Sequence, residues 1–415
     1  MSDKKRVVIT GLGVVAPNGI GKDELWDNCF AGVSGIKPIT LFDVSKYRCR
    51  YAGEISDFQP ERYLGPKGLR NLDRTTLLSL VAAKLAIEDA KLEITDDNRN
   101  DIGVVLGSTM GSVHSISEFD KEGLREGPRY VNPAQFPNTV INSPASQVAI
   151  RFGLRGLNAT ISTGFTASLD AMSYAWDMLT LGRIKVLLVG GVEELCIQTF
   201  LGFYKVGILA TASNGSPPPY TPFDPHRSGT LLGEGSAFFV LEALEDAQAR
   251  QVTVYGELLG YGTRFTASSL YRYDPEAEGA TSAIEQALQD AEIGPDAVDL
   301  VSASANATRA CDAMEATALN RVFGSKAGRV TVHAPKAILG ESFSAAGALQ
   351  LAVVLGMLNH KQLPPAANWQ QLNGQLKGTA TTLPSSTPVT RVLVNGVGLT
   401  GVSSALVVGA AIDEA

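Results

Sequence analysis

The chain alternates between short, almost wholly apolar runs and longer runs in which apolar residues recur every three or four positions. Residues 102–107 and 184–192 are runs of the first kind, and residues 77–90 form a run of the second kind with little charge on any face. A strand that is apolar throughout is buried on both faces, whereas a period of 3.6 indicates a helix. The pattern therefore predicts a sheet that is covered by helices on both sides.

A similar order of elements occurs twice along the chain. The first series ends with a strand predicted for residues 233–242, and a second series of strands and helices then begins. This repeated order predicts an internally duplicated α/β fold, with an N-terminal half at residues 1–250 and a C-terminal half at residues 251–415. The second series comprises strands at 254–261, 298–303, 329–333, 389–394 and 403–408 and helices at 281–291, 312–323 and 344–358.

Residues 108–136 form the most irregular stretch of the N-terminal half. Glycines, charges and aromatic residues are mixed there, and a helix is predicted only afterwards, over residues 142–152. Long irregular segments in compact proteins are usually functional or mobile. We therefore expect this stretch to take part in function rather than in the core.

Residues 159–165 have the pattern of a nucleophile elbow that carries no nucleophile. A β-branched run ends at Thr163 and Gly164, and an apolar-periodic run begins at Phe165. The pattern predicts a strand, a sharp turn and a buried helix. Backbone N–H groups and the positive end of the helix would lower the pKa of a thiol at such a turn, but the residue here is a phenylalanine.

Composition narrows the class of protein. The chain has 415 residues, of which 45% are hydrophobic and 19% charged, and this is typical of a large α/β protein. Its net charge of −7 argues against a nucleic-acid binder. The four cysteines show no metal-site spacing, no secretory signal is seen, and no run of 18 or more apolar residues is found. We therefore expect a cytoplasmic protein without a metal site or a membrane span.

Several motifs in order resemble the β-ketoacyl-carrier-protein synthases, which are condensing enzymes of the thiolase fold. The resemblance runs from about residue 6 to residue 410 and implies a five-layered α-β-α-β-α arrangement of two duplicated halves. The motifs are an opening strand at residues 7–19, a mid-chain signature at residues 222–229 with 233–235, a lysine motif at residues 334–340 with 345–347, and a terminal glycine loop at residues 395–401.

In the β-ketoacyl-carrier-protein synthases, a cysteine accepts the acyl chain, while two histidines promote decarboxylation of the malonyl unit and stabilise the enolate oxygen. By resemblance, the cysteine position is Phe165 and the two histidine positions are Ser304 and Glu341. Lys336 matches the lysine of the family. A phenyl ring at the elbow would fill the inner end of the acyl tunnel, and Leu399 and Thr400 replace the residues that gate the pocket in the family.

The resemblance implies a chain length factor, which is the ketosynthase-like subunit of a bacterial type II polyketide or aryl-polyene heterodimer. We expect a chain that is not an enzyme by itself, that pairs with a Cys-His-His ketosynthase and that shapes the tunnel of this partner. No cofactor of its own is implied, because a partner acyl carrier protein carries the phosphopantetheine. Residues 108–146 are expected at the interface, and the candidates to line the partner's tunnel, or to form ordinary interface core, are Met110, Gln135, Phe136 and Asn138.

Two other interpretations stay open at this point. One is an autonomous acyl-processing enzyme, a thioesterase or acyltransferase, that uses Ser304 and Glu341 or His333. A serine hydroxyl needs an adjacent base, and a carboxylate of ordinary pKa is a poor one. Lys336, which matches the lysine of the family, would be well placed to pair with Glu341 and neutralise it, and we favour this structural interpretation. The other interpretation is a homodimeric protein that binds an acyl carrier without chemistry.

Overall fold

The computed structural model describes residues 5–211, 218–267, 272–365, 376–377, 379–380 and 389–411. Within these ranges, strands from both halves of the chain join in one 12-stranded sheet. Its N-terminal part contains β1 (Val7–Ala16), β2 (Gly19–Ile20), β5 (Ile102–Gly107), β6 (Asn158–Ile161), β7 (Val186–Glu193) and β8 (Gly235–Ala243), and its C-terminal part contains β9 (Gly256–Phe265), β10 (Leu300–Ser302), β11 (Thr331–His333), β12 (Thr379–Ala380), β13 (Arg391–Val397) and β14 (Val402–Gly409).

The order of the strands confirms the predicted duplication. The N-terminal strands lie in the order β1-β8-β7-β5-β6 and the C-terminal strands in the order β9-β14-β13-β10-β11, with the short strands β2 beside β1 and β12 beyond β11. Ranked by their place in the chain, both series have the spatial order 1-5-4-2-3. The two series meet where residues 7–9 of β1 pair antiparallel with residues 256–258 of β9. Two halves with one topology therefore share a continuous backbone ladder.

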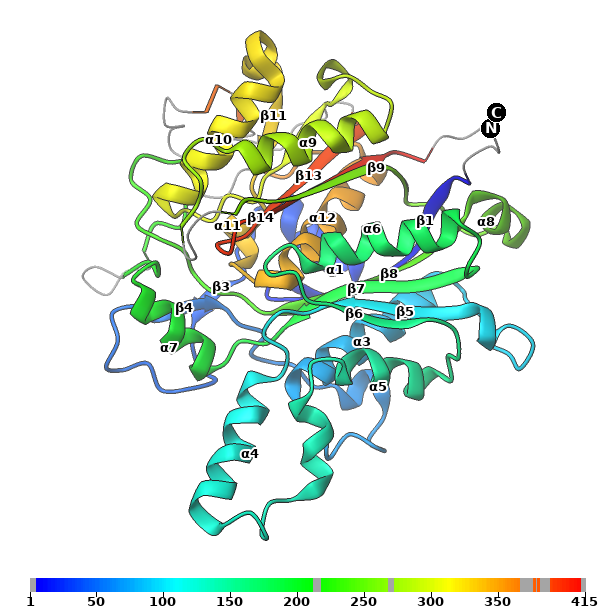
Figure 1. Ribbon diagram of the computed structural model, residues 1–415, viewed down its shortest axis with the longest axis vertical. Helices are drawn as coiled ribbons and strands as arrows, with labels where there is room; N and C mark the ends of the chain where they lie inside the picture. The colour runs from blue at the N-terminus through cyan, green and yellow to red at the C-terminus, as the bar shows by residue number, and fades with distance from the viewer. Residues whose placement is uncertain are drawn as a thin grey trace.

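Helices and strands form five layers, as expected for the thiolase-like fold (Figure 1). The outer layers are α3 with α5 on the N-terminal strands and α9 with α10 on the C-terminal strands, while α6 and α12 lie between the two groups of strands. The helices of these layers are α3 (Arg74–Asp89), α5 (Ser143–Phe152), α6 (Ala167–Thr180), α9 (Glu278–Asp290), α10 (Arg309–Phe323) and α12 (Ala346–His360).

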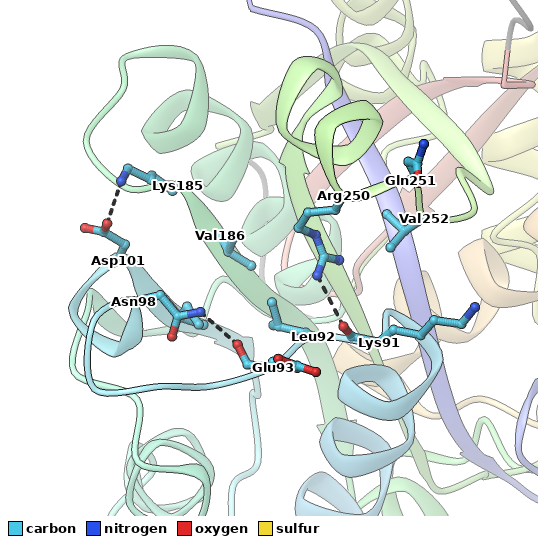
Figure 2. A pocket seen from close by; sticks show the side chains of 11 residues that line it. Lys91, Leu92, Glu93, Asn98, Asp101, Lys185, Val186, Arg250, Gln251 and Val252 are labelled. Atoms are coloured by element: carbon cyan, nitrogen blue, oxygen red, sulfur yellow. Dashed lines mark hydrogen bonds and ion pairs between the residues drawn. The ribbon is translucent and has the colours of Figure 1, made fainter.

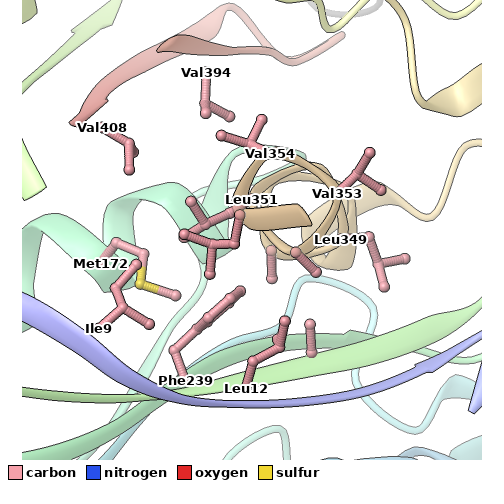
Figure 3. Close-up of a cluster of buried hydrophobic side chains, with 14 of the residues drawn as sticks. Ile9, Leu12, Met172, Phe239, Leu349, Leu351, Val353, Val354, Val394 and Val408 are labelled. Carbon is pink, nitrogen blue, oxygen red and sulfur yellow. The ribbon is translucent and has the colours of Figure 1, made fainter. Parts of the chain in front are cut away.

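The central core lies around α12, whose residues 346–358 are all buried. Figure 3 shows the side chains that converge on it from both groups of strands, among them Leu12 and Phe239 on one side and Val394 and Val408 on the other. The window Phe343–His360 is long and apolar enough, by length and mean composition, to cross a membrane, although polar residues interrupt it. It is nevertheless 89% buried inside the fold, as a central core helix is.

The segment that we predicted to be irregular, residues 108–136, contains a helix, so this prediction was wrong. Helix α4 (Val113–Glu126) projects away from the layers and is followed by η2 (Pro133–Thr139), as Figure 1 shows. None of the side chains of α4 is buried. The remaining elements are β3 (Ile36–Pro38), β4 (Tyr51–Gly53), α1 (Lys22–Phe30), α2 (Glu61–Leu64), α7 (Ile197–Val206), α8 (Leu244–Arg250), α11 (Lys336–Leu339), η1 (Arg99–Asp101), η3 (Pro295–Ala297), η4 (Gly324–Arg329) and η5 (Phe343–Ala345).

Candidate active site

The residues that we singled out lie together, after the carboxyl ends of several strands. Phe165 follows β6, Ser304 follows β10, and Glu341 follows β11 through α11. Ligands and catalytic groups in open α/β sheets gather at this edge because the strand ends and their loops converge there. The topology thus brings three positions that are far apart in the chain to one site.

The elbow has the predicted geometry. Gly164 has a φ of +96°, a conformation that favours glycine, and α6 begins three residues later. The Oγ1 of Thr109, which follows β5, donates to the Gly164 carbonyl at 2.6 Å. The hydroxyls of Thr163 and Thr166 both donate to Asp170 in the first turn of α6. The turn is therefore fixed from both the neighbouring strand and the helix.

Phe165 fills the position at the end of this turn. Its side chain is only 7% exposed and lies edge-on to two rings, with centroids 5.1 Å from Phe343 and 6.0 Å from Phe203. The rings of Phe203 and Phe343 stack on each other at 4.8 Å. Leu399 belongs to the same apolar cluster as Phe165. The space around Phe165 is occupied by aromatic side chains.

A buried polar cluster adjoins the backbone of Phe343. The Nζ of Lys336 donates to Glu341 Oε2 at 2.8 Å and to Ser304 Oγ at 3.2 Å. The amide of Asn306 and the backbone N–H of Phe343 donate to the two oxygens of Glu341, at 3.0 and 3.1 Å. Ser304, Lys336 and Glu341 are each at most 3% exposed. The buried ion pair thus has further hydrogen bonds, which such pairs need to offset desolvation.

This arrangement leaves Ser304 without a base. Its Oγ accepts from Lys336 and from the backbone N–H of Val397 at 3.0 Å. An ammonium that is paired with a carboxylate donates protons, so neither neighbour takes a proton from the hydroxyl. The imidazole of His333 is buried at the end of β11, and burial lowers its pKa to about 4. The geometry does not support a serine nucleophile at Ser304.

Two more carboxyl groups support the backbone around Ser304, and sequence reasoning did not assign them a role. Glu315 accepts from the Ser304 N–H at 2.8 Å and from Asn395 at 2.5 Å, while Asp312 accepts from the N–H groups of Asn306 and Ala307. Burial raises the pKa of Asp312 to about 6 and that of Glu315 to about 7. Both residues stand in α10 and fix the loop after β10.

The interface candidates divide into two pairs. Phe136 is 57% exposed and Gln135 is also exposed, so both face outward from η2. Asn138 is buried and donates to the Asn71 carbonyl at 2.6 Å, and Met110 packs on the cluster that contains Phe165. Only Gln135 and Phe136 are free to touch another subunit in this conformation.

A cleft of about 570 Å³ lies at the opposite ends of the strands, where β5 and β7 begin (Figure 2). The ion pair of Lys185 with Asp101, at an N–O distance of 2.8 Å, lies on one side of the cleft, and Arg250 on the other side donates to the carbonyls of Ala90 and Lys91. The cleft is therefore separate from the candidate active site. In the part of the chain that the structure describes, no group of three or more His, Cys, Asp and Glu side chains is placed to hold a metal ion.

Comparison with known proteins identifies the family. Residues 4–247 match the model of the N-terminal domain of β-ketoacyl synthases, and residues 255–370 match the model of the C-terminal domain. The chain belongs to the β-ketoacyl synthase family. A similar protein is the 3-oxoacyl-[acyl-carrier-protein] synthase 2 of Coxiella burnetii, at 36% identity over 88% of this chain and 89% of that protein. The protein of the same name from Synechocystis is 32% identical over 88% of each chain.

Solved structures of β-ketoacyl synthases have the same fold over nearly the whole chain. The ishigamide ketosynthase/chain length factor superimposes with a TM-score of 0.91 at 29% identity, covering 99% of this chain and 100% of that chain. A ketosynthase in complex with a type II polyketide synthase acyl carrier protein superimposes with a TM-score of 0.90 at 26% identity and the same coverage. The thiolase-like fold that we expected is confirmed.

One expectation is corrected by these comparisons. We expected that the chain is not an enzyme by itself, because all three catalytic positions of the family differ. The relatives at 32 to 36% identity are instead named 3-oxoacyl-[acyl-carrier-protein] synthase 2, which is the name of an enzyme. The chain is therefore a member of an enzyme family.

Proposed function

We propose that this chain is the chain-length-determining subunit of a heterodimeric β-ketoacyl synthase of a type II polyketide or aryl-polyene system. The observation that carries the proposal is the closed elbow, where Phe165 packs against Phe203 and Phe343 at the position of the family's nucleophile. A phenyl ring cannot form a thioester, and the ion pair of Lys336 with Glu341 occupies the region where the family has a histidine. A cysteine for the pair must then come from the other subunit.

An exposed apolar surface supports the pairing. Helix α4 contributes no buried side chain to the fold, and Leu124 on it is 88% exposed. Phe136 in the following η2 is also exposed. Large apolar side chains that are exposed on neighbouring elements often mark interaction sites. Within the described part of the chain, the large exposed apolar residues of this region are Leu124, Tyr130, Phe136, Val140, Ile141 and Ile150.

Strand β6, which leads into the elbow, is an edge of the sheet within the described residues. It pairs with β5 on one side only, over residues 158–161, and its side chains are exposed or half-buried. An edge strand presents unpaired N–H and C=O groups to a neighbouring chain. A partner that covers β6 would lie directly beside the turn at Gly164, which is the position from which this subunit can limit the partner's tunnel.

The proposed partner is a ketosynthase with an intact cysteine and two histidines. An acyl carrier protein would bring the growing chain and the malonyl unit to the pair on its phosphopantetheine, so this chain needs no cofactor of its own. One of the similar solved structures is a ketosynthase/chain length factor, and another is a ketosynthase bound to its acyl carrier protein. The four cysteines are buried and free, which fits the reducing cytoplasm that we propose as its location.

The test is co-expression of the chain with Cys-bearing ketosynthases encoded beside it, followed by purification and assay with acyl and malonyl carrier proteins. We expect a stable 1:1 complex, and covalent acyl label on the ketosynthase subunit rather than on this chain. Product length should change when residues of this chain at the interface are enlarged. If the purified chain alone forms a 3-oxoacyl product, it acts as its named relatives do, and the proposal fails.

A further inference from the structure

The connection between β5 and α4 is held by two neighbouring carboxyl groups at the end of β7. Glu193 Oε1 accepts from the backbone N–H groups of Thr109 and Met110, at 2.5 and 2.9 Å. Glu194 Oε1 accepts from the N–H of His114, in the first turn of α4, at 3.2 Å. Because Thr109 also donates to Gly164, these contacts join the elbow to the base of the projecting helix.

Neither carboxyl group has much contact with water. Glu193 is 0% exposed, its Oε2 has no hydrogen-bond partner, and its Oε1 also accepts from Ser344 at 2.5 Å. Burial raises the pKa of Glu193 to about 7. Glu194 is 3% exposed, and burial together with the nearby charges of Asp73 and Glu193 raises its pKa to about 8.

The charged and titratable groups around Glu194 do not offset its charge well. Arg74 of α3 lies nearby, but its guanidinium donates to both oxygens of Glu234, at 2.6 and 2.7 Å. The charge of Glu54 also interacts with the Arg74 guanidinium and raises its pKa. The thiol of Cys196, whose pKa is raised by burial and then by Glu194, and the imidazole of His114, which contacts Gln198, are the other titratable groups on the surrounding elements.

Helix α4 packs against η2 and α7 at the surface but is not anchored in the core. It has no buried side chain, and Gly111, just before it, has a φ of +57°. Thr75 of α3 donates to the Gly111 carbonyl at 3.2 Å, so the glycine lies between two fixed points and can act as a hinge. Opening at Gly111 would bring water to Glu193 and Glu194 and turn α4 relative to the elbow.

We propose that Glu193 and Glu194 form a proton-dependent latch that fixes the base of α4 while Glu194 is protonated and releases it when both groups are ionised. The closed arrangement keeps the Glu194 proton more tightly than an open one in which water reaches the carboxyl group. Opening is therefore linked to loss of the Glu194 proton above pH 7, and of the Glu193 proton as well at lower pH. It becomes more favourable as pH rises, by up to about tenfold per pH unit for each proton lost, until the closed form itself is ionised.

The test is hydrogen–deuterium exchange of the purified chain, followed on peptides that cover residues 110–126 between pH 6 and pH 9. After correction for the intrinsic exchange rate, we expect the protection of these peptides to fall at least about tenfold between pH 6 and pH 8 and to level off above pH 8. E194Q should remove the part of the fall above pH 7, where Glu193 is already ionised. E118Q removes an exposed carboxyl group on α4 itself and should leave the fall unchanged.

D73N provides a second variant if E194Q does not fold. Asn is as good an N-cap for α3 as Asp, so the helix is kept, while removal of one charge lets Glu194 ionise at lower pH. The fall in protection should then level off at lower pH and be smaller. Equal protection at pH 6 and pH 8 in the wild-type chain would overturn the latch, as would an unchanged fall in E194Q. The experiment needs no partner, so its outcome is independent of the proposed heterodimer.

Discussion

The ring of Phe165 is held between two other phenylalanines, and its removal should be costly to the fold. Truncating a buried phenylalanine loses its apolar contacts and leaves a cavity, so we expect Phe165→Ala to lower the free energy of unfolding by about 3 kcal/mol. Urea unfolding followed by circular dichroism measures the change. Phe136→Ala removes the same atoms from an exposed site and should stay within about 0.5 kcal/mol of the wild type. Equal effects of the two variants would show that the elbow is not packed.

Removing one partner of the Lys336–Glu341 ion pair should lower the free energy of unfolding more than replacing both partners by neutral groups. Lys336→Met leaves a buried carboxylate without its cation, and we expect the free energy of unfolding to fall by about 3 to 5 kcal/mol. The double variant Lys336→Met with Glu341→Gln keeps the hydrogen bonds from Asn306 and Phe343 to a neutral amide and should recover most of this loss. A double variant as unstable as the sum of the two single variants would contradict a coupled pair.

At this scale, the sequence predicted which positions form the site but not what surrounds them. The motifs placed Phe165, Ser304 and Glu341 together, because their spacing resembles that of a family with a known fold. Asn306 escaped attention because an amide within a loop has no periodic or charge signal. Phe203 was missed for a different reason, since the helix that carries it, α7, had not been predicted.

Helices α4 and α7 were not predicted from the sequence pattern. In α4, Val113, Ile116 and Phe119 recur every three residues, but Gly111, Gly123 and the charges between them suggested an irregular segment. The apolar side of α4 is narrow and the rest of the helix is polar and charged, unlike the core helices, whose apolar residues cover more of their surface. The core strands and helices were predicted within a few residues because burial on both sides imposes an apolar pattern on them.

The surface around α4 gives a prediction at the scale of elements. Phe136→Asp introduces a charge where the proposed partner would exclude water, so we expect loss of the complex with the ketosynthase while the circular dichroism spectrum is unchanged. Co-purification and analytical ultracentrifugation measure the loss. Leu181→Asp, at an exposed apolar residue that follows α6, serves as the control and should leave the complex intact. Pairing that survives Phe136→Asp but not Leu181→Asp would place the interface elsewhere.

The molecule as a whole buries several carboxyl groups that bind protons more tightly in the folded than in the unfolded chain. The pKa of Glu315 is raised to about 7 and that of Asp312 to about 6, in each case chiefly by burial. Their stabilising contribution is complete below the unfolded pKa values of 4.5 and 3.8 and is lost as pH rises through the folded values. His333 has the opposite effect on stability. Burial lowers its pKa to about 4, so the free energy of unfolding falls as pH decreases from 6.5 to 4.

We therefore expect the free energy of unfolding to fall between pH 5 and pH 7 and to fall less steeply in Glu315→Gln. Urea unfolding at pH 5, 6 and 7 tests this, with Glu278→Gln, an exposed position at the start of α9, as the control. A free energy of unfolding that rises steadily over this range would mean that His333 and the ionised carboxylates outweigh the buried groups. An unchanged slope in Glu315→Gln would exclude this residue as a source.

The duplicated architecture followed from the order of strands and helices, whereas the way in which the halves join did not. Periodicity and apolar runs specify each element and its burial, and the repeated order indicated two similar halves. The pairing of β1 with β9 depends on backbone groups that any apolar strand offers. Side-chain patterns carry no record of which strand lies beside which, so the continuous sheet is visible only in the structure.

Strand β1 lies between β8 and β9, so it cannot pair until most of the chain has been synthesised on the ribosome. Val7 pairs with Ala243 and with Leu258, so the first strand to be made waits for partners that lie more than two hundred residues later. At about 5 to 20 residues per second, this wait lasts roughly ten to fifty seconds. Contacts so distant in sequence also slow folding itself. An apolar strand that stays unpaired for so long is a natural substrate for chaperones.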